Sequence, residues 1–378
     1  MIEETIMDVC IDRDALNEAV EQVHIAGGDI ARANPIFAFL RLSSTEDRLE
    51  IVASNSIVTA TTVVPVKAPT PGALCVPLKL FRQAIEVLPR GDLRLQCRED
   101  DGERNRLVLT APGWSLALSI RSASDYPPTP TVTDEGIGLS SHVLRFLLAR
   151  TAHAADKNLD RPIFGCVRIL HEGPDLVAQA MDGQRVAQAR TTGALPGSEP
   201  ILLHQLACEE ILRLLSSASE NTVVRFGAGG DHLFVSTERT TVAIARLPGD
   251  LPEMPVEVSS KRVRSARVPR SLLLNALRAS RKLTQHREVC LSLSSDGITV
   301  SSDPRLQEIS VRDYVAGTVH GAPFELGANG DHLAEALGRL ECDEVVLEFG
   351  AEPVDPISLR PTSDEDVVMI FMPMTLFR

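Results

Sequence analysis

Residues 77–89 read PLKLFRQAIEVLP, and this stretch decides the fold because its pattern returns twice further along the chain. Its apolar positions fall on one helical face and are Leu80, Phe81, Ala84, Ile85 and Leu88. Equivalent faces contain Ala207, Cys208, Ile211, Leu212 and Leu215, and then His332, Leu333, Ala336, Leu337 and Leu340. Corresponding positions are 127 and then 125 residues apart, a spacing that indicates a large internal repeat.

A second amphipathic helix is predicted ahead of each copy of that pattern. Its apolar faces contain Ala15, Leu16, Ala19, Val20 and Val23, then Val143, Leu144, Leu147 and Leu148, and finally Leu272, Leu273, Ala276 and Leu277. Alternating strands with turn signals lie between the helices, and each repeat ends in a strand. The sequence therefore predicts an α+β fold of three similar domains in series, each with two helices packed on curved antiparallel sheets.

The repeat also sets the expected domain boundaries, at residues 1–128, 134–254 and 258–378. Three such domains in series leave an unpaired edge strand at each end of the chain, and an open edge favours pairing with another chain. Two chains joined head to tail would pair these edges and close a ring.

Composition limits the classes of protein that fit. A net charge of −13 argues against a chain coated in positive charge, although a local basic surface remains compatible with it. The seven cysteines are scattered without a CxxC pair, which favours reduced thiols over disulfides or a zinc site. No signal peptide is recognised, and the apolar runs fall short of the roughly 20 residues that span a bilayer. We therefore expect a cytoplasmic protein with no membrane partner.

Charge is unevenly distributed along the third repeat. Residues 261–282 contain eight basic residues and no acidic one, whereas residues 341–366 contain nine acidic residues and one arginine. A positive helical surface suits sequence-independent contact with DNA phosphates. The alternative interpretation is an ordinary solvated linker and helix face.

Several segments resemble one known family. Residues 181–187, MDGQRVA, resemble the TDGHRLA segment of the β subunit of bacterial DNA polymerase III, and residues 372–376, MPMTL, resemble its MPMRL ending. Shorter matches occur in order along the whole chain and are Val76-Pro77, Asp125-Tyr126-Pro127, Arg161-Pro162-Ile163-Phe164 and Leu251-Pro252. Combined with the threefold period, this ordered set makes the resemblance specific.

The resemblance implies a DNA sliding clamp, which is a non-catalytic processivity factor that encircles duplex DNA as a head-to-tail homodimer. It also implies a hydrophobic pocket, between the second and third domains, for short peptides of DNA polymerases and the clamp loader. By motif match the pocket residues are Phe164, Met181, Gly183, Gln184, Arg185, Val186, Pro252, Ile370, Phe371, Met372, Pro373, Met374 and Leu376.

Other roles follow from the resemblance with less direct matches. Arg32 matches a basic residue in a loop that touches DNA, and charge and placement add Arg270, Arg278, Arg281 and Lys282. Trp114 and Leu116 match an apolar pair at the dimer interface, although a core position for the tryptophan is an equal alternative.

The chain also departs from the family pattern. Gln184 replaces a histidine, Thr375 replaces a basic residue, and residues 251–257, LPEMPVE, replace an aromatic and arginine-containing stretch. These changes predict an altered peptide preference and keep open a specialised second clamp or a clamp-derived scaffold. An enzyme is disfavoured, because the histidines are dispersed without an HExxH motif and Gly227–Gly230 lacks the Lys-Ser/Thr of a phosphate loop. No catalytic residue, metal or cofactor is predicted.

Overall fold

The structure is a computed structural model, and it describes residues 5–27, 34–55, 57–98, 106–133, 136–158, 160–193, 195, 199–216, 222–247, 249–253, 262–302, 309–363 and 366–375. Arg32 and Leu376, both predicted site residues, lie outside the described residues.

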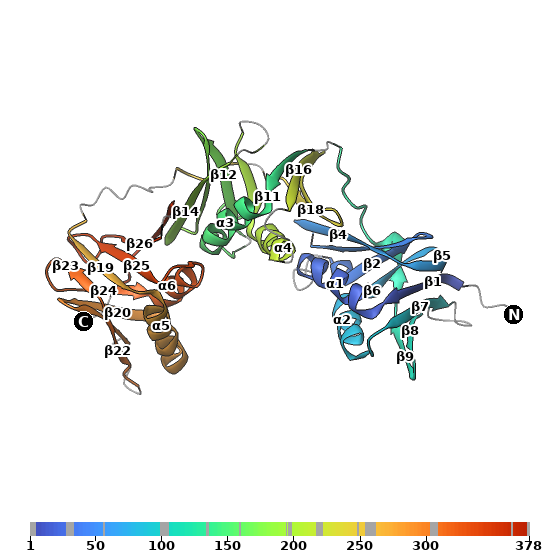
Figure 1. The fold of residues 1–378 in the computed structure, drawn as a ribbon, viewed down its shortest axis with the longest axis horizontal. Helices are drawn as coiled ribbons and strands as arrows, with labels where there is room; N and C mark the ends of the chain where they lie inside the picture. The colour runs from blue at the N-terminus through green and yellow to red at the C-terminus, as the bar shows by residue number, and fades with distance from the viewer. Residues whose placement is uncertain are drawn as a thin grey trace. The chain divides into compact units, whose positions relative to one another are not determined.

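The described elements follow one order three times: a strand, a helix, a run of strands, a second helix and three final strands (Figure 1). The first repeat contains β1 (Thr5–Asp12), α1 (Arg13–Val23), β2 (Phe39–Ser44), β3 (Arg48–Ser54), β4 (Val58–Pro65), β5 (Lys67–Thr70), β6 (Gly72–Pro77), α2 (Leu78–Val87), β7 (Asp92–Arg98), β8 (Arg106–Ala111) and β9 (Trp114–Ser119). Short elements β10 (Arg121–Ser122) and the 3-10 helix η4 (Ala123–Asp125) follow it.

The second and third repeats have the same plan. The second contains β11 (Ile137–Ser140), α3 (Ser141–Thr151), η5 (Ala152–Ala154), β12 (Cys166–Glu172), β13 (Asp175–Met181), β14 (Arg185–Thr192), β15 (Ile201–His204), α4 (Gln205–Ser216), β16 (Val223–Gly229), β17 (His232–Ser236) and β18 (Thr240–Ala245). The third contains β19 (Arg264–Pro269), α5 (Arg270–Thr284), β20 (Glu288–Ser294), β21 (Gly297–Ser302), β22 (Arg312–Ala316), β23 (Thr318–His320), β24 (Phe324–Asn329), α6 (Gly330–Leu337), β25 (Glu344–Phe349), β26 (Ile357–Pro361) and β27 (Asp366–Phe371). The α+β prediction and all six predicted helices are confirmed.

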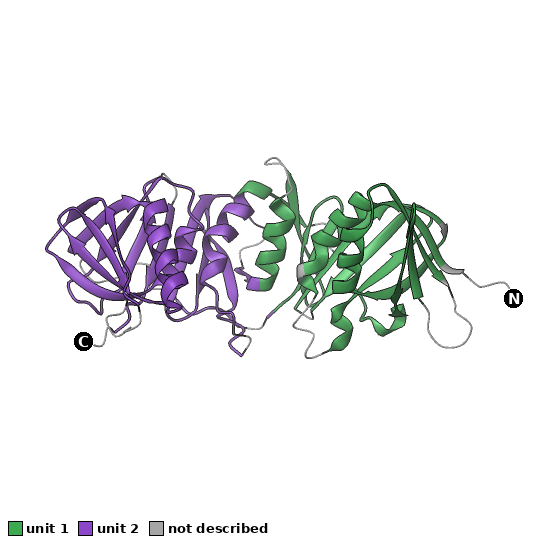
Figure 2. Cartoon of the chain, turned by 90° about the horizontal axis from the view of Figure 1, so that it is seen from below, with its two compact units in different colours: residues 1–142, 206–246 green, residues 143–205, 247–378 purple. Residues whose placement is uncertain are grey.

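The chain forms two compact units, one of residues 1–142 and 206–246 and the other of residues 143–205 and 247–378 (Figure 2). Each contains one nine-stranded sheet, with the order β10-β6-β2-β3-β4-β18-β17-β16-β11 in the first and β15-β12-β13-β14-β27-β26-β25-β19-β23 in the second. These sheets run from one repeat into the next, which is why the units divide the middle repeat between its neighbours. The three-domain boundaries expected from the sequence stay a prediction.

Two antiparallel strand pairs make these sheets continuous. We call the β4–β18 pair the first seam and the β14–β27 pair the second seam. In the first seam Ala60 is opposite Val242, and in the second Ala187 is opposite Met369. Within each seam main-chain hydrogen bonds join two repeats, so that no strand edge is left open there.

The two seams agree down to single hydrogen bonds. In the turn before β4, the side-chain oxygen of Asn55 accepts from the amides of residues 57 and 58, and Asp182 does the same for residues 184 and 185 before β14. The amide of Ala245 donates to the carbonyl of Ile57 (2.9 Å), as that of Met372 does to Gln184 (2.8 Å). Corresponding residues of the repeats can therefore be compared position by position.

The apolar helical faces predicted from the sequence agree with the structure except at two exposed leucines. Phe81, Ala84 and Ile85 are buried, as the periodicity predicts. Leu80 and Leu272 were also expected on the apolar faces, but they are 51% and 50% exposed. Both lie on helices of the two end repeats.

A buried polar contact ties α1 to both strands of the first seam. The amide oxygen of Gln22 accepts hydrogen bonds from the hydroxyls of Thr62 (3.1 Å) and Thr240 (2.7 Å). The two threonines are almost fully buried. Replacing Gln22 by leucine removes an acceptor that two buried hydroxyls share.

We predict that Gln22→Leu destabilises the first unit by about 1–3 kcal/mol, because buried polar groups lose a hydrogen-bond partner. Urea denaturation of the full chain should show an earlier transition. Glu18→Leu, at an exposed position of the same helix, is the matched control and should leave the midpoint within error. Equal midpoints for Gln22→Leu and the wild type would contradict this role for the glutamine.

Candidate functional site

A small apolar cluster lies at the second seam, separate from the main cores. Val186, Val368 and Ile370 are buried together, and Met181 packs against them half-buried. Side chains alternate between the faces of a strand, so Val368 and Ile370 point away from Val367, Met369 and Phe371. We call Met181, Val186, Val368 and Ile370 the seam cluster. It brings together three predicted pocket residues and adds Val368, which the alternation along the last strand could have indicated.

The turn before β14 is held in place by its charged residues. Arg185 is buried and donates to the carboxylates of Asp182 (2.9 Å) and Glu335 (2.7 Å). Gly183 has a φ of +92°, a conformation that favours glycine, while Gln184 is exposed. The predicted residues Gly183, Gln184 and Arg185 thus form the turn beside the seam cluster, and the ion pairs of Arg185 fix the position of this turn.

The chain beyond β27 borders the same cluster. Besides the bond from Met372 to Gln184, the amide of Met374 donates to the carbonyl of Gly327 in β24 (2.9 Å). The side chain of Met372 is 48% exposed, whereas Phe371 is buried. Pro373 and Met374 are half-buried. An exposed, flexible methionine beside a cluster of branched side chains is suited to contact ligands of varied shape.

Phe164 is linked to the turn before β14 by the side chain of Arg161. The Arg161 guanidinium stacks on the Phe164 ring, 4.2 Å from its centroid, and donates to the main-chain carbonyl of Asp182 (3.2 Å). Pro252 is exposed and follows the buried Leu251. Arg161 was recognised only as part of a motif, because a sequence does not reveal which ring or carbonyl an arginine side chain contacts.

The equivalent positions of the first seam have a different chemistry. Ser54, Thr59, Thr241 and Ala243 stand where the seam cluster has Met181, Val186, Val368 and Ile370. The hydroxyls of Ser54 and Thr59 are hydrogen bonded to each other (2.8 Å). The two seams have the same backbone arrangement, but all four of these positions are apolar only in the second seam. This difference is what a selective apolar binding site requires.

A histidine is buried next to the ion pairs of the second seam. Burial, aided by the positive charge of Arg185, lowers the pKa of His153 to about 3. No hydrogen-bond partner for either ring nitrogen lies among the described residues. Glu335 faces it, bonded to Arg185 and also to Lys157 (3.4 Å). His153 is therefore neutral in the folded protein at ordinary pH.

The predicted DNA-binding residues of α5 divide into two groups. Arg278, Arg281 and Lys282 are exposed, although Arg281 is also paired with Asp331 of α6 (3.2 Å). Arg270 instead donates to the carbonyls of Cys342 (2.8 Å) and Leu337 (3.1 Å), which ties α5 to the end of α6.

Arg339 is a further exposed basic residue at the end of α6. It follows Gly338, which borders the Arg278 guanidinium. Arg278 and Lys282 lie one turn apart on α5 and Arg339 follows α6, and we call these three exposed residues the basic surface of the third repeat. By contrast, the exposed face of α1 carries Asp14 and Glu18.

The predicted interface residues lie on β9, the last strand of the sheet β5-β1-β7-β8-β9. Trp114 is 50% exposed and Leu116 half-buried, so the alternative core position for the tryptophan is wrong for the single chain. The hairpin registers place Leu116 in line with Val242 and Met369, both fully buried within seams. β9 therefore resembles a seam strand without a partner.

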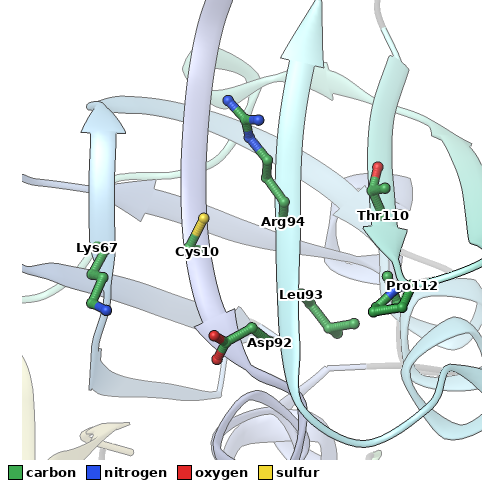
Figure 3. A pocket seen from close by; sticks show the side chains of 8 residues that line it. Cys10, Lys67, Asp92, Leu93, Arg94, Thr110 and Pro112 are labelled. Atoms are coloured by element: carbon green, nitrogen blue, oxygen red, sulfur yellow. The ribbon is translucent and has the colours of Figure 1, made fainter.

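One hollow, of about 440 Å³, lies elsewhere, on β1, β5, β7 and β8 of the first repeat. Figure 3 shows Lys67, Cys10, Arg94 and Thr110 around it, and their strand registers place them in one row across four strands. None of the residues predicted from the sequence to bind peptide or DNA lines it.

Two family models match the chain. One, described as the N-terminal domain of the DNA polymerase III beta subunit, matches residues 7–130, and another, described as its C-terminal domain, matches residues 263–375. The chain belongs to the DNA polymerase III beta subunit family. Within the part of this family member that the structure describes, we find no helix long and apolar enough to cross a membrane.

Relatives in this family extend over nearly the whole chain. Proteins named beta sliding clamp are 21% identical in Staphylococcus aureus and 22% identical in Staphylococcus epidermidis, over 91% of this chain and 93% of each relative. The beta subunit structure from Thermotoga maritima has a TM-score of 0.83 at 18% identity, covering 98% of this chain and 100% of that one. A Pseudomonas aeruginosa sliding clamp bound to griselimycin has a TM-score of 0.80 at 20% identity, with the same coverage. The expected clamp fold is confirmed.

The lowered pKa of His153 gives a pH dependence to the second unit. Because the folded pKa lies below that of an unfolded histidine, the unfolded chain binds more protons between pH 6.5 and 3, and stability falls as the pH falls through this window. At pH 5 this residue should cost about 2 kcal/mol relative to pH 7.5.

We therefore predict that His153→Leu reduces the dependence of the urea midpoint on pH between 7.5 and 5; the remaining dependence includes His204 and His332, whose pKa values burial also lowers. His320→Leu, at an exposed position of the same unit, should keep the wild-type slope. A His153→Leu variant that loses stability on acidification as steeply as the wild type would show that other groups cause the loss.

Proposed function

We propose that this chain is a DNA sliding clamp, which closes head to tail with a second copy, encircles duplex DNA and tethers DNA polymerases through the seam cluster. It acts as a processivity factor and performs no catalysis. The observation that carries this proposal is the pair of equivalent seams, because a third seam of the same kind would close a ring of two chains.

The repeat predicts which strands form the third seam. Each seam pairs the strand at the position of β4 and β14 with one at the position of β18 and β27. The corresponding strands at the two ends of the chain are β22 and β9. Transferring the register of the two seams places Val311, which precedes β22, opposite Leu116 of the second copy. Trp114 and Leu116 would then become buried like their equivalents.

DNA binding rests on the basic surface of the third repeat. Arg278, Lys282 and Arg339 offer charges to phosphates without reading bases, which suits a protein that must slide. We infer that Arg32 and Arg281 contribute as well, the first on the family match alone. Arg270 contributes mainly by fixing α5 against α6.

Peptide binding rests on the contrast between the two seams. An apolar cluster with an exposed methionine can accept the apolar side chains of a short linear segment, and a few such anchors supply most of the affinity. The exposed Gln184 and Thr375 lie at positions where the family carries other residues. They support the second candidate function, a specialised clamp whose preferred clients differ from those of the main replicase.

The third seam gives a direct prediction. Leu116→Glu should convert the dimer to a monomer in sedimentation velocity, because a charge would be buried opposite Val311 of the second copy. Ser115→Glu is the matched control, since this neighbour points to the opposite, exposed face, where its first-seam equivalent Thr241 stays half-exposed, and it should leave the dimer intact. If Leu116→Glu sediments as the wild type does, β9 is not the interface strand.

The seam cluster gives a second prediction. Ile370→Asp should weaken binding of a fluorescent peptide from the clamp-binding segment of a bacterial replicative polymerase by at least about tenfold, because an apolar anchor site acquires a charge. Thr241→Asp places the same charge on the same face of the first seam, at a half-exposed position, and serves as the control. Fluorescence anisotropy measures both, and equal loss in the two variants would contradict a site confined to the second seam.

A further inference from the structure

A row of side-chain hydrogen bonds crosses three strands of the second nine-stranded sheet. The Arg168 guanidinium in β12 donates to the side-chain oxygen of Gln179 in β13 (2.8 Å). The side-chain nitrogen of Gln179 donates in turn to the side-chain oxygen of Gln188 in β14 (2.7 Å). The strand registers place these residues directly opposite one another. We call Arg168, Gln179 and Gln188 the amide ladder.

The arginine sets the direction of every bond in the amide ladder. A guanidinium has donors but no acceptor, so Gln179 turns its oxygen toward Arg168 and its NH2 group toward Gln188. Gln188 then accepts with its oxygen and presents its own NH2 group at the end of the ladder. Arg168 is itself held in place, because it also donates to the carbonyl of Leu251 (3.1 Å) and pairs with Asp250 (3.4 Å).

The amide ladder ends beside the seam cluster. Gln188 follows Val186 by two residues on β14, so both side chains lie on the same face of the strand. Across the second seam Gln188 is directly opposite Val368. Gln188 is half-buried, and its NH2 group has no hydrogen-bond acceptor among the residues that the structure describes. Two directed amide donors therefore border the apolar cluster.

The first seam has different residues at the three ladder positions. They are Arg41, Val52 and Thr61, which have the same strand registers. Arg41 pairs with Glu50 instead (2.7 Å), and a valine cannot relay a hydrogen bond to the next strand. The amide ladder is therefore not a consequence of the shared backbone. It belongs to the seam that contains the apolar cluster.

A ligand on the seam cluster would also shield the neighbouring NH2 group of Gln188 from water. Donors that leave water without gaining an acceptor weaken binding, because their hydrogen bonds to water are lost. A ligand side chain that carries an oxygen acceptor, above all a carboxylate, replaces these bonds. A lysine or arginine side chain has only donors and cannot replace them. The orientation of the ladder thus favours one chemical class of ligand.

We propose that Gln188 is a specificity-determining residue of the peptide site, which selects client segments with an acceptor side chain, such as a carboxylate, beside their apolar anchors. Gln179 and Arg168 are positioning residues that hold its amide in the selective orientation. This inference rests on the proposed peptide-binding function and names the class of client for the same site. The net charge of −13 by itself favours basic peptides, so a preference for a carboxylate is diagnostic.

Fluorescence anisotropy with the full-length protein tests the proposal. The probe is a labelled peptide from the clamp-binding segment of a bacterial replicative polymerase, in versions that place aspartate or lysine at each position flanking its apolar anchors. At one of these positions the wild type should bind aspartate at least about threefold more tightly than lysine, as expected for one hydrogen bond. Gln188→Glu should reverse this preference, because it offers the peptide an acceptor, and Gln188→Leu should abolish it.

Two further variants separate the ladder from general effects of charge. Gln179→Val introduces the first-seam residue and leaves the Gln188 amide free to turn. The preference for aspartate should fall, while binding of the parent peptide stays within about twofold of the wild type. Thr61→Glu adds the same charge as Gln188→Glu at the equivalent position of the first seam, and it should leave the preference unchanged.

The outcomes distinguish this inference from the proposed function. A wild type that prefers aspartate at no position, or a preference that Gln188→Glu leaves unchanged, overturns the selective role of Gln188 while peptide binding stands. A preference that survives Gln179→Val contradicts the positioning role of the ladder. A wild type that binds none of the peptides overturns the proposed function and this inference with it. The urea midpoint confirms folding of each variant, and Gln188→Leu supplies the test if Gln188→Glu unfolds.

Discussion

Pairing between edge strands of successive repeats is the interaction on which the rest of the structure depends. A β-sheet edge presents unpaired amides and carbonyls, and in this chain β4 pairs with β18, and β14 with β27, of the neighbouring repeat. The consequence is a sheet that runs from one repeat into the next, with the same turn and the same hydrogen bonds at both seams. A chain built in this way has two unpaired ends of complementary type, and a second copy is the simplest partner for both.

The two seams have the same backbone hydrogen bonds but different side chains. One architecture could therefore provide a purely structural contact at one seam and a binding site at the other. Three hydroxyl residues and an alanine occupy the positions of the seam cluster in the first seam, while valine, isoleucine and methionine occupy them in the second. The ion pair of Arg185 with Glu335 ties β14 of the second seam to α6. Binding would therefore be confined to one seam by a change of a few side chains, with no change in fold.

Much of the fold could be predicted from the sequence, because the same spacing of apolar residues occurs in each of the three repeats. The helices, the fold class and the apolar last strand, which contains Ile370, follow from that period and from the family resemblance. What could not be predicted depends on which side chains meet across the chain. Arg270 was expected at DNA but bonds to two carbonyls, and Leu80 was expected in a core but is exposed. Periodicity assigns a residue to a helical face, but it does not reveal whether a neighbour covers that face.

The central claim about this protein is that two chains form a closed ring around DNA. The most direct measurement is the retention of loaded protein on nicked circular DNA before and after the circle is cut once, followed by gel filtration at a salt concentration that removes simple electrostatic binding. A closed ring should stay with the circle and slide off the ends within minutes of linearisation. Equal retention on circular and linear DNA, or release from both, would contradict the central claim.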